Sequence, residues 1–333
     1  MLERELFHQY GIVVNHVYRV SGGYVLQTGE LGECILKRAE AEREEDFPWY
    51  VLISQYFNQQ NEPTLLPVPS KRGRYIETIG NEATTLYQLP LKTRTIRESD
   101  GHRLALLHRK GGNLLTSYSE LPEVQPWQMR WQRRIDQLEA YRVTLMQQEQ
   151  PLREFDTLFI ETFPYYLGLS ENAIQYLVDA GIDAGVNPFE VRTLVFRRYN
   201  AQYIGDTEFL SPSEFILDHP ARDLAEWIRY KLIDESAGFD EVRSFIWDYH
   251  QRRSMNAMDW NLLYARILFP ISYVEAIERY YSEENLKEKQ KIYHRLQNYV
   301  NHEGDREALF KGIFSELIGE RGSTMRQIEW LTI

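Results

Sequence analysis

The chain contains a single cysteine, Cys34, in 333 residues. One cysteine forms no internal disulfide, and it excludes a zinc site assembled from several cysteines. Long apolar runs are also missing: the mean hydropathy is -0.50, and no run reaches the roughly 18 apolar residues of a membrane-spanning helix. The first residues, Met-Leu-Glu-Arg-Glu-Leu, alternate in charge and lack an apolar segment. We therefore expect neither a membrane span nor a secretory signal peptide.

Positive charge is in short supply. The chain has 38 Lys and Arg against 49 Asp and Glu, for a net charge of -11. Because binding to nucleic acid depends on neutralising phosphates, we expect no nucleic-acid partner. A predicted helix carries Arg130, Arg133 and Arg134 beside Trp127 and Trp131. We interpret these arginines as a solvated helix face rather than as a stacking surface for bases.

Aromatic residues, in contrast, are abundant at 13% of the chain. Aromatic side chains bury large areas, so this share favours a large packed body or a protein that works in an assembly. Hydrophobic residues make up 43% and charged residues 26%, as in globular proteins. This composition excludes a wholly disordered chain, a collagen and a coiled-coil rod, and the length fits one large domain or two ordinary ones.

The first ninety residues are rich in short strand patterns separated by turn residues. One helix interrupts them, because apolar residues from Trp49 to Phe57 recur at helical spacing and Asn61-Glu62-Pro63 ends the pattern. We expect strands near residues 13–18, 24–26, 34–38, 74–77 and 83–88, with turns at 21–23, 29–32 and 80–81.

Helical periodicity predominates after Pro90. The longest predicted helix runs from Trp127 to Glu149 with an apolar stripe along one face. The one strand-like interruption lies between Arg192 and Asp218. We expect further helices at 101–108, 153–167, 171–180, 220–235, 240–252, 260–268 and 272–281, followed by two C-terminal helices.

This order predicts an α+β protein with the two-lobed layout of the protein-kinase-like fold. Residues 1–89 would form a small β-rich N-lobe, an antiparallel sheet plus one helix. Residues 90–333 would form a large helical C-lobe, with a hinge near residues 88–90 and the catalytic segment at 193–223.

Five segments resemble the aminoglycoside phosphotransferase and choline kinase superfamily, in the order in which that superfamily has them. Within it, the chain is similar to the spore-coat kinase-like proteins of the CotS group, and among these to the YutH-type members. The resemblance implies a kinase-like fold of the aminoglycoside phosphotransferase type. The segments are Cys34-Ile35-Leu36-Lys37, Leu86-Tyr87-Gln88-Leu89-Pro90, Arg103 to His108, Pro220 to Trp227, and Ile267-Leu268-Phe269-Pro270 with Tyr280-Tyr281.

Lys37 lies where a kinase carries the strand lysine that holds nucleotide phosphates. An acid on the following helix normally orients this lysine, and Glu42, Glu44 and Glu45 are the candidates. The residues alone also fit a lysine at a strand end beside a solvated charge run. Gly22 and Gly23 lie where the superfamily has its phosphate-covering turn, although two glycines also suit an ordinary hairpin.

The catalytic loop is the informative departure from the family. The resemblance implies a His-Gly-Asp type of motif in Thr193 to Asn200, but the chain has Phe196, Arg197 and Arg198 there. A guanidinium stays protonated and cannot act as a general base. Asn200 is too close to be the metal-binding Asn, and Asp206 is the nearest downstream carboxylate. We expect Arg198 to pair with an acid, Asp206 or Asp218.

Asp218 is the candidate for the metal-binding Asp of the family. Asp223 follows Asp218 at an interval of five positions, whereas the family usually has about ten, so Asp218 also fits a turn residue. The resemblance implies that Asp223 supports the catalytic loop, and Arg222 is spaced to pair with Glu226 along one helix. The eight histidines show no ligand-pair spacing, and we interpret His108 as a structural residue at a helix end.

The leading hypothesis is therefore an endospore coat-associated protein with a degenerate kinase-like fold, which binds other spore coat proteins and needs no cofactor. The resemblance implies synthesis in the mother-cell cytoplasm. One alternative is a phosphotransferase that uses ATP and Mg²⁺ and acts on a small-molecule hydroxyl, with Asp206 or Asp218 doing the work of two acids. The other is a regulator that binds nucleotide through Lys37 without turnover. The oligomeric state stays open.

Overall fold

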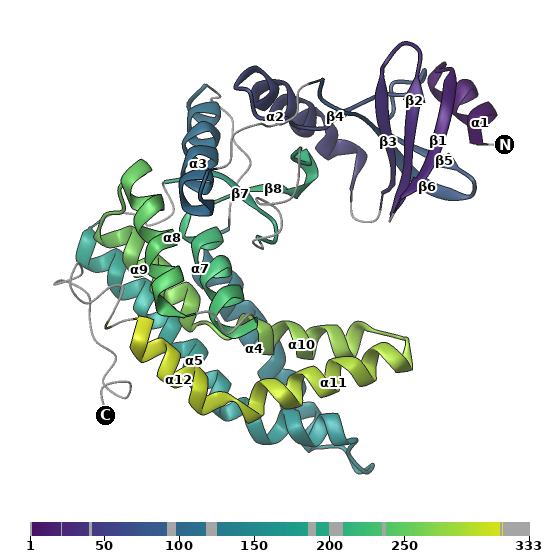
Figure 1. Cartoon of the computed structure of the whole chain (residues 1–333). Helices are drawn as coiled ribbons and strands as arrows, with labels where there is room; N and C mark the ends of the chain where they lie inside the picture. The colour runs from purple at the N-terminus through teal and green to yellow at the C-terminus, as the bar shows by residue number, and fades with distance from the viewer. Residues whose placement is uncertain are drawn as a thin grey trace.

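The computed structural model describes residues 2–20, 22–39, 42–91, 98–117, 125–185, 191–199, 209–234, 238–313 and 315. It has a β-rich N-terminal part and a mostly helical C-terminal part, joined beside helix α2 (Phe47–Gln59) (Figure 1). The predicted α+β class is confirmed. Within the described residues, no helix combines the length and the apolar character needed to span a membrane.

The N-terminal sheet is antiparallel throughout, with strand order β1-β2-β3-β6-β4. Strand β5 also pairs with β6, along residues 82–85, whereas β4 pairs with residues 87 and 88. Alternation along β3 turns Cys34 and Leu36 toward helix α1 (Leu2–Tyr10), where Leu6 is fully buried against them. The strands are β1 Val14–Val20, β2 Gly23–Thr28, β3 Glu33–Arg38, β4 Leu66–Pro67, β5 Ile76–Ile79 and β6 Glu82–Gln88.

Helix α2, preceded by the 3-10 turn η1 (Glu44–Asp46), joins the two parts of the molecule. Its buried Ile53 and Phe57 belong to the core of the C-terminal part, and the Phe57 ring lies 5.3 Å from that of Phe215. The segment after α2 is held by backbone hydrogen bonds between Leu65 N–H and Leu210 C=O (2.8 Å) and between Leu210 N–H and Pro63 C=O (2.7 Å). Because Phe47 and Tyr50 of the same helix pack with Tyr87 of the sheet, helix α2 contributes to the cores of both parts.

Buried charges reinforce this junction. Glu62, which is 2% exposed, pairs with Arg103 and with Lys110 of helix α3 (Asp100–Thr116), the Lys110 Nζ lying 2.6 Å from Oε1. Helix α3 in turn packs closely on strand β7, because Gly111 has no side chain: a Cβ there would lie 2.9 Å from the backbone N of Leu194.

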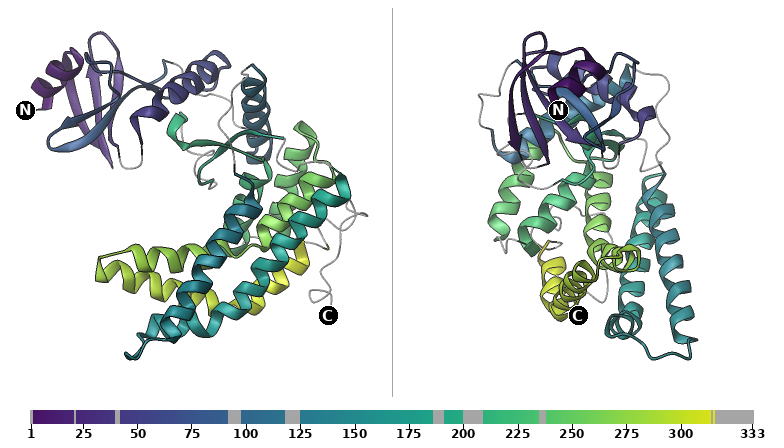
Figure 2. Two further views of the ribbon diagram at one scale, coloured as in Figure 1. Left: turned by 180° about the vertical axis from the view of Figure 1, so that it is seen from behind. Right: turned by 90° about the vertical axis from the view of Figure 1, so that its right-hand side faces the viewer.

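The C-terminal part consists of long helices around a two-stranded hairpin of β7 and β8. Helices α10 and α11 form a pair that extends beneath the N-terminal sheet in Figure 1 and in the reverse view of Figure 2. The elements are α4 Trp127–Met146, α5 Glu154–Ala184, β7 Thr193–Phe196, η2 Pro212–Glu214, β8 Phe215–Asp218, α7 Ala221–Arg229, η3 Tyr230–Asp234, α8 Phe239–Arg252, α9 Ala257–Leu268, α10 Ile271–Ser282, α11 Leu286–Asn301 and α12 Glu303–Gly312.

Three sequence-based element predictions were wrong. The two helices expected at 153–167 and 171–180 form the single helix α5, because Leu169 and Ser170 at the expected break are buried and the Ser170 hydroxyl donates to the Tyr166 carbonyl. Helix α1 was not predicted at all. His108 lies in the middle of α3 rather than at a helix end.

Candidate functional site

The β7–β8 hairpin carries the segment that the sequence singled out. Its register pairs Thr193 with Asp218 and Phe196 with Phe215, so Phe196 and Asp218 lie on opposite strands at opposite ends of the ladder. Arg197 and Arg198 follow the end of β7. Phe196 is buried, with its ring 4.8 Å from that of Phe215. The hairpin is thus fixed by its own apolar side chains before any charged group is considered.

Asp223 supports this hairpin from the first turn of α7. Its fully buried carboxylate accepts the backbone N–H of Phe196 (3.0 Å to Oδ2) and contacts Nε2 of His108 (3.0 Å), whose Nδ1 lies 2.8 Å from the Tyr249 hydroxyl. Burial raises the pKa of Asp223 well above its ordinary value and lowers the pKa of His108 well below 6.5. Burial thus disfavours the charged form of both groups, and His108 is held at the centre of this buried network, in keeping with a structural role.

Asp218 ends strand β8 and is enclosed by donors. Its Oδ1 accepts the indole N–H of Trp127 and the backbone N–H of His219, each at 2.8 Å. Its Oδ2 accepts a guanidinium N–H from Arg130 at 3.0 Å and one from Arg222 at 3.1 Å. The carboxylate is 1% exposed, and all four of its lone-pair sites are used.

The charge balance around Asp218 is that of a buried ion cluster. Burial by itself would raise the pKa of Asp218, but Arg266, Arg130 and Arg222 together hold this pKa below its ordinary value of 3.8. Arg266 is buried as well and pairs with Glu226, N to O 2.9 Å. Asp218 is therefore a charged carboxylate neutralised by guanidinium groups.

The surroundings of Asp218 do not fit a magnesium site. Mg²⁺ needs carboxylate oxygens that are free to coordinate it, usually from one or two acids. Asp218 offers its oxygens to arginines instead. Across the ranges that the structure describes, no three His, Cys, Asp or Glu side chains converge on one point. Asp206 and Asn200 lie outside the described residues.

Arg198, which the family resemblance implies at the position of the catalytic base, pairs with an acid other than Asp218. Its side chain is 78% exposed and pairs with Glu275 of α10 at 3.2 Å. The expectation that Asp218 pairs with Arg198 was therefore wrong, because Arg130 and Arg222 already occupy that acid. Arg197 lies along the surface, and its backbone carbonyl accepts a hydrogen bond from Arg222 at 2.9 Å.

The arginines of α4 also correct an interpretation. They do not form a shared solvated face: Arg130 binds Asp218, and Arg134 makes a two-pronged pair with Glu278 at 2.7 and 2.6 Å. Of the three, Arg133 is the exposed one. The spacing of Arg222 four residues after Asp218 was a readable signal of this cluster, whereas nothing in the sequence connects Arg130 with Asp218.

Lys37 lies on β3 with its ammonium 5.9 Å from the centre of the Tyr87 ring. Within the described part of the chain it has no carboxylate at salt-bridge distance. Burial lowers the pKa of Lys37, and the charges of Glu214 and Glu42 partly oppose this shift. The ammonium is therefore largely buried and is stabilised by a ring and by more distant acids.

The three acids proposed as partners of Lys37 bind other groups. Glu42 accepts the hydroxyls of Tyr87 (2.6 Å) and Thr85 (2.9 Å). Glu44 accepts the backbone N–H groups of residues 75 and 76, and Glu45 pairs with Arg43 at 2.9 Å. Each of these acids thus serves the local structure of the loop before α2.

Gly22 and Gly23 are both explained by the β1–β2 hairpin. Gly22 has φ +83°, which favours glycine, and a Cβ on Gly23 would lie 2.0 Å from the Leu36 carbonyl oxygen. Together with Lys37 they line a pocket of about 500 Å³ at the strand ends. Leu2, Leu36 and other residues on the α1 side of the sheet complete its wall, so this pocket lies mainly on the face opposite Tyr87.

Comparison with known proteins agrees with this architecture. An aminoglycoside phosphotransferase from Alicyclobacillus acidocaldarius superposes with a TM-score of 0.65 over 95% of this chain and 96% of its own, at 12% identity. The spectinomycin phosphotransferase APH(9)-Ia, solved with ADP and spectinomycin, has a TM-score of 0.56 at 11% identity, over 89% and 93% of the two chains. At such identities these likenesses show the fold alone.

Sequence comparison resolves the family. The endospore coat-associated protein YutH of Bacillus subtilis is 34% identical over 236 residues, which cover 69% of this chain and 68% of that protein. The family model described as "Spore coat putative kinase YutH" matches residues 3–313. The chain therefore belongs to the YutH family of spore coat kinase-like proteins.

Proposed function

We propose that this protein is a coat-associated component of the endospore that uses a kinase-like fold to bind other coat proteins and does not transfer phosphate. The observation that carries the proposal is the enclosure of Asp218. The acid that should coordinate magnesium accepts four hydrogen bonds, two of them from arginines. A metal ion would have to displace those guanidinium groups from a buried site.

The position of the general base supports the same conclusion. A base must take the proton of an acceptor hydroxyl within hydrogen-bond reach, and its contribution is typically about 10²–10⁴-fold. Arg198 occupies that position and keeps its proton at neutral pH. Its pairing with Glu275 is that of a surface salt bridge.

A buried hydrogen-bond network nevertheless holds the β7–β8 hairpin in place. Asp223, His108 and Tyr249 form one buried network that fixes the backbone of Phe196. Such a network stabilises a fold whether or not the fold catalyses a reaction. A binding protein that retains the kinase-like frame while its reacting positions change is consistent with both observations.

The coat assignment is supported by the name of the Bacillus subtilis relative, an endospore coat-associated protein. We infer that this chain is made in the mother-cell cytoplasm and joins the coat from there, with other coat proteins as its partners. The test is to express a tagged copy in sporulating Bacillus subtilis that lacks its own YutH. The tag should appear in the extracted coat fraction, for the wild type and for Arg198→Ala alike. A tag that stays in the mother-cell lysate would contradict the proposal.

The catalytic half is tested by phosphate transfer from ATP to a panel of small hydroxylated acceptors. We expect no turnover above the protein-free control. Asp218→Ala is the test variant, and Asp136→Ala, an exposed acid of α4, is the matched control. Turnover that Asp218→Ala abolishes and Asp136→Ala retains would establish the phosphotransferase alternative.

A further inference from the structure

A large cavity lies in the C-terminal part, and Arg198, which follows strand β7, is among the residues that line it. It has a volume of about 1010 Å³ and is enclosed by helices α4, α10, α11 and α12 with the end of α7. This volume is at the upper end of the range of small-molecule sites, about 300–1,000 Å³. The cavity also has apolar walls, which include Leu232, Ile292 and Leu296.

The cavity is rich in positive charge although the chain as a whole has a net charge of -11. Six arginines line it against three acids, Glu275, Glu278 and Asp305. A concave surface of one charge sign concentrates ligands of the opposite sign. The six are Arg134, Arg198, Arg229, Arg279, Arg295 and Arg306.

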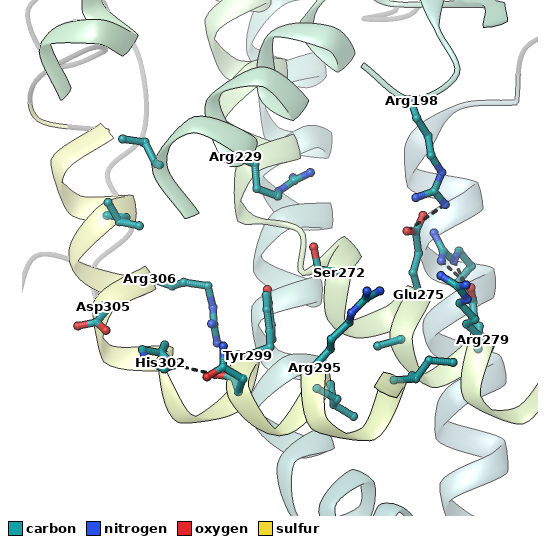
Figure 3. A pocket seen from close by; sticks show the side chains of 18 of the residues that line it. Arg198, Arg229, Ser272, Glu275, Arg279, Arg295, Tyr299, His302, Asp305 and Arg306 are labelled. Carbon is teal, nitrogen blue, oxygen red and sulfur yellow. Dashed lines mark hydrogen bonds and ion pairs between the residues drawn. The ribbon is translucent and has the colours of Figure 1, made fainter. Parts of the chain in front are cut away.

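These arginines divide by how they are paired. Arg134 and Arg198 bind the lining acids Glu278 and Glu275. The guanidinium groups of Arg279 and Arg295, in contrast, make no hydrogen bond or ion pair within the described residues. The hydrogen bond from Lys291, and after it the charges of these two arginines, lower the pKa of Glu288. Figure 3 shows Arg295 rising from α11 toward Ser272 of α10. The guanidinium groups of Arg279 and Arg295 therefore line the cavity with N–H donors that a ligand could use.

Arg306 provides an independent observation. Its side chain is only 3% exposed and pairs with Glu303 and the Tyr166 hydroxyl, yet its Nε–H has no partner within the described structure. A buried donor without an acceptor destabilises the folded state. Arg306 lines the same cavity, and an anionic oxygen there would supply an acceptor.

From these observations we infer that the cavity binds a small polyanion, a molecule with at least two carboxylate or phosphate groups. Arg279 and Arg295 would each engage an anionic group, because the planar guanidinium forms two parallel hydrogen bonds with such groups. The aliphatic wall would contact the uncharged part of the ligand. This inference does not depend on the proposed coat function, since it concerns neither Asp218 nor a protein partner.

The experiment is isothermal titration calorimetry of the full chain with citrate and, separately, with inorganic pyrophosphate. Both titrations are run at about 0.15 M constant ionic strength, so that a general salt effect is excluded. We expect saturable binding of at least one probe, and the stronger probe distinguishes a carboxylate ligand from a phosphate ligand. Arg295→Gln and Arg279→Gln should each weaken it at least about tenfold, which is 1.4 kcal/mol.

Two further variants sharpen the result. Arg295→Lys keeps the charge but loses the two-pronged geometry, so it should bind with intermediate affinity. Arg252→Gln removes an exposed arginine of α8 outside the cavity and should leave the affinity unchanged. All variants should unfold at the temperature of the wild type. The inference is wrong if neither probe binds the wild type more tightly than about 1 mM, or if Arg252→Gln weakens binding as much as Arg295→Gln.

Discussion

Asp218 and Asp223 are five residues apart and both are buried, yet their environments are opposite. Asp218 faces arginines from α4, α7 and α9, which keep its pKa low in spite of burial. Asp223 faces a backbone N–H and an imidazole, so burial dominates and its pKa rises. One acid is held as a charge in an ion cluster, and the other lies in a buried hydrogen-bond network where burial disfavours its charged form.

The two acids differ in role: Asp223 supports the backbone of the β7–β8 hairpin, whereas Asp218 is the acid for which the family resemblance implies a part in catalysis. The Asp223 network fixes the strand that leads to Arg198, and it needs no net charge to do so. At Asp218, which the family resemblance implies as a metal ligand, the carboxylate is paired with Arg130 and Arg222. On the function proposed above, the scaffold is kept while these positions take structural roles.

The largest expected effect comes from breaking the ion cluster. Asp218→Asn leaves Arg130 and Arg222 without their acid, and removal of one partner of a buried pair costs about 3–5 kcal/mol. We expect a loss of this size in urea unfolding at pH 7. Asp136→Asn, on the exposed face of α4, should change the unfolding free energy by less than about 0.5 kcal/mol. A loss for Asp218→Asn below about 1 kcal/mol would mean that the cluster is not a structural ion pair.

A smaller loss is expected at Asp223. Asp223→Asn keeps one acceptor oxygen for the Phe196 N–H but disturbs the hydrogen bond to His108. One poorly satisfied buried group costs about 1–3 kcal/mol. Equilibrium unfolding by urea measures this cost. If Asp223→Asn proves more destabilising than Asp218→Asn, the assignment of the two environments is reversed.

The pH dependence of these two losses should have opposite signs. Asp218 has a folded pKa below its unfolded value of 3.8, so its contribution is complete above about pH 4 and is lost as the pH falls through the folded pKa. Asp223 has a folded pKa above its unfolded value, so its contribution is complete below 3.8 and is lost as the pH rises through the folded pKa.

Urea unfolding of the wild type and both variants between about pH 3 and pH 8 checks this. The destabilisation by Asp218→Asn should shrink toward low pH, because the wild-type carboxyl then becomes neutral too. The destabilisation by Asp223→Asn should shrink toward high pH. Parallel pH profiles for the two variants would be incompatible with the contrast drawn between the acids.

The smallest effect is expected at Arg198. Arg198→Asp restores an acid at the position of the catalytic base and removes an exposed pair with Glu275, which is worth about 0–1 kcal/mol. We expect a stability change within about 1 kcal/mol and no gain of phosphate transfer, because Asp218 stays bound to its arginines. Phosphate transfer by Arg198→Asp that is absent from the wild type would show that one substitution had disabled an otherwise competent site.

Much of the fold was readable from the sequence because it depends on local signals. The sheet, helix α2 and the apolar stripe of α4 follow from periodicity and from turn residues. Leu2, Leu6 and Tyr10 of helix α1 recur every four residues. The helix was missed because a segment of nine residues gives only a weak helical pattern.

The candidate site was predicted only in part. The sequence paired Arg222 with Glu226 from their spacing, and that pair is present at 3.6 Å, but the contact of Arg222 with Asp218 at 3.1 Å was not predicted. The contacts of Asp218 with Trp127 and Arg130 join α4 to β8, and they depend on how distant helices pack. The partner of Arg198 was missed for the same reason, since Glu275 belongs to α10.

The central claim is that the reacting positions of this kinase-like fold hold structural ion pairs instead of magnesium and nucleotide. Calorimetric titration of the wild type with ATP, with and without Mg²⁺, tests it most directly. The account predicts weak or absent binding that Mg²⁺ does not improve and that Lys37→Met does not change. Magnesium-dependent binding tighter than about 10 μM, roughly -7 kcal/mol, and its loss in Lys37→Met would contradict the claim and establish a nucleotide-binding regulator.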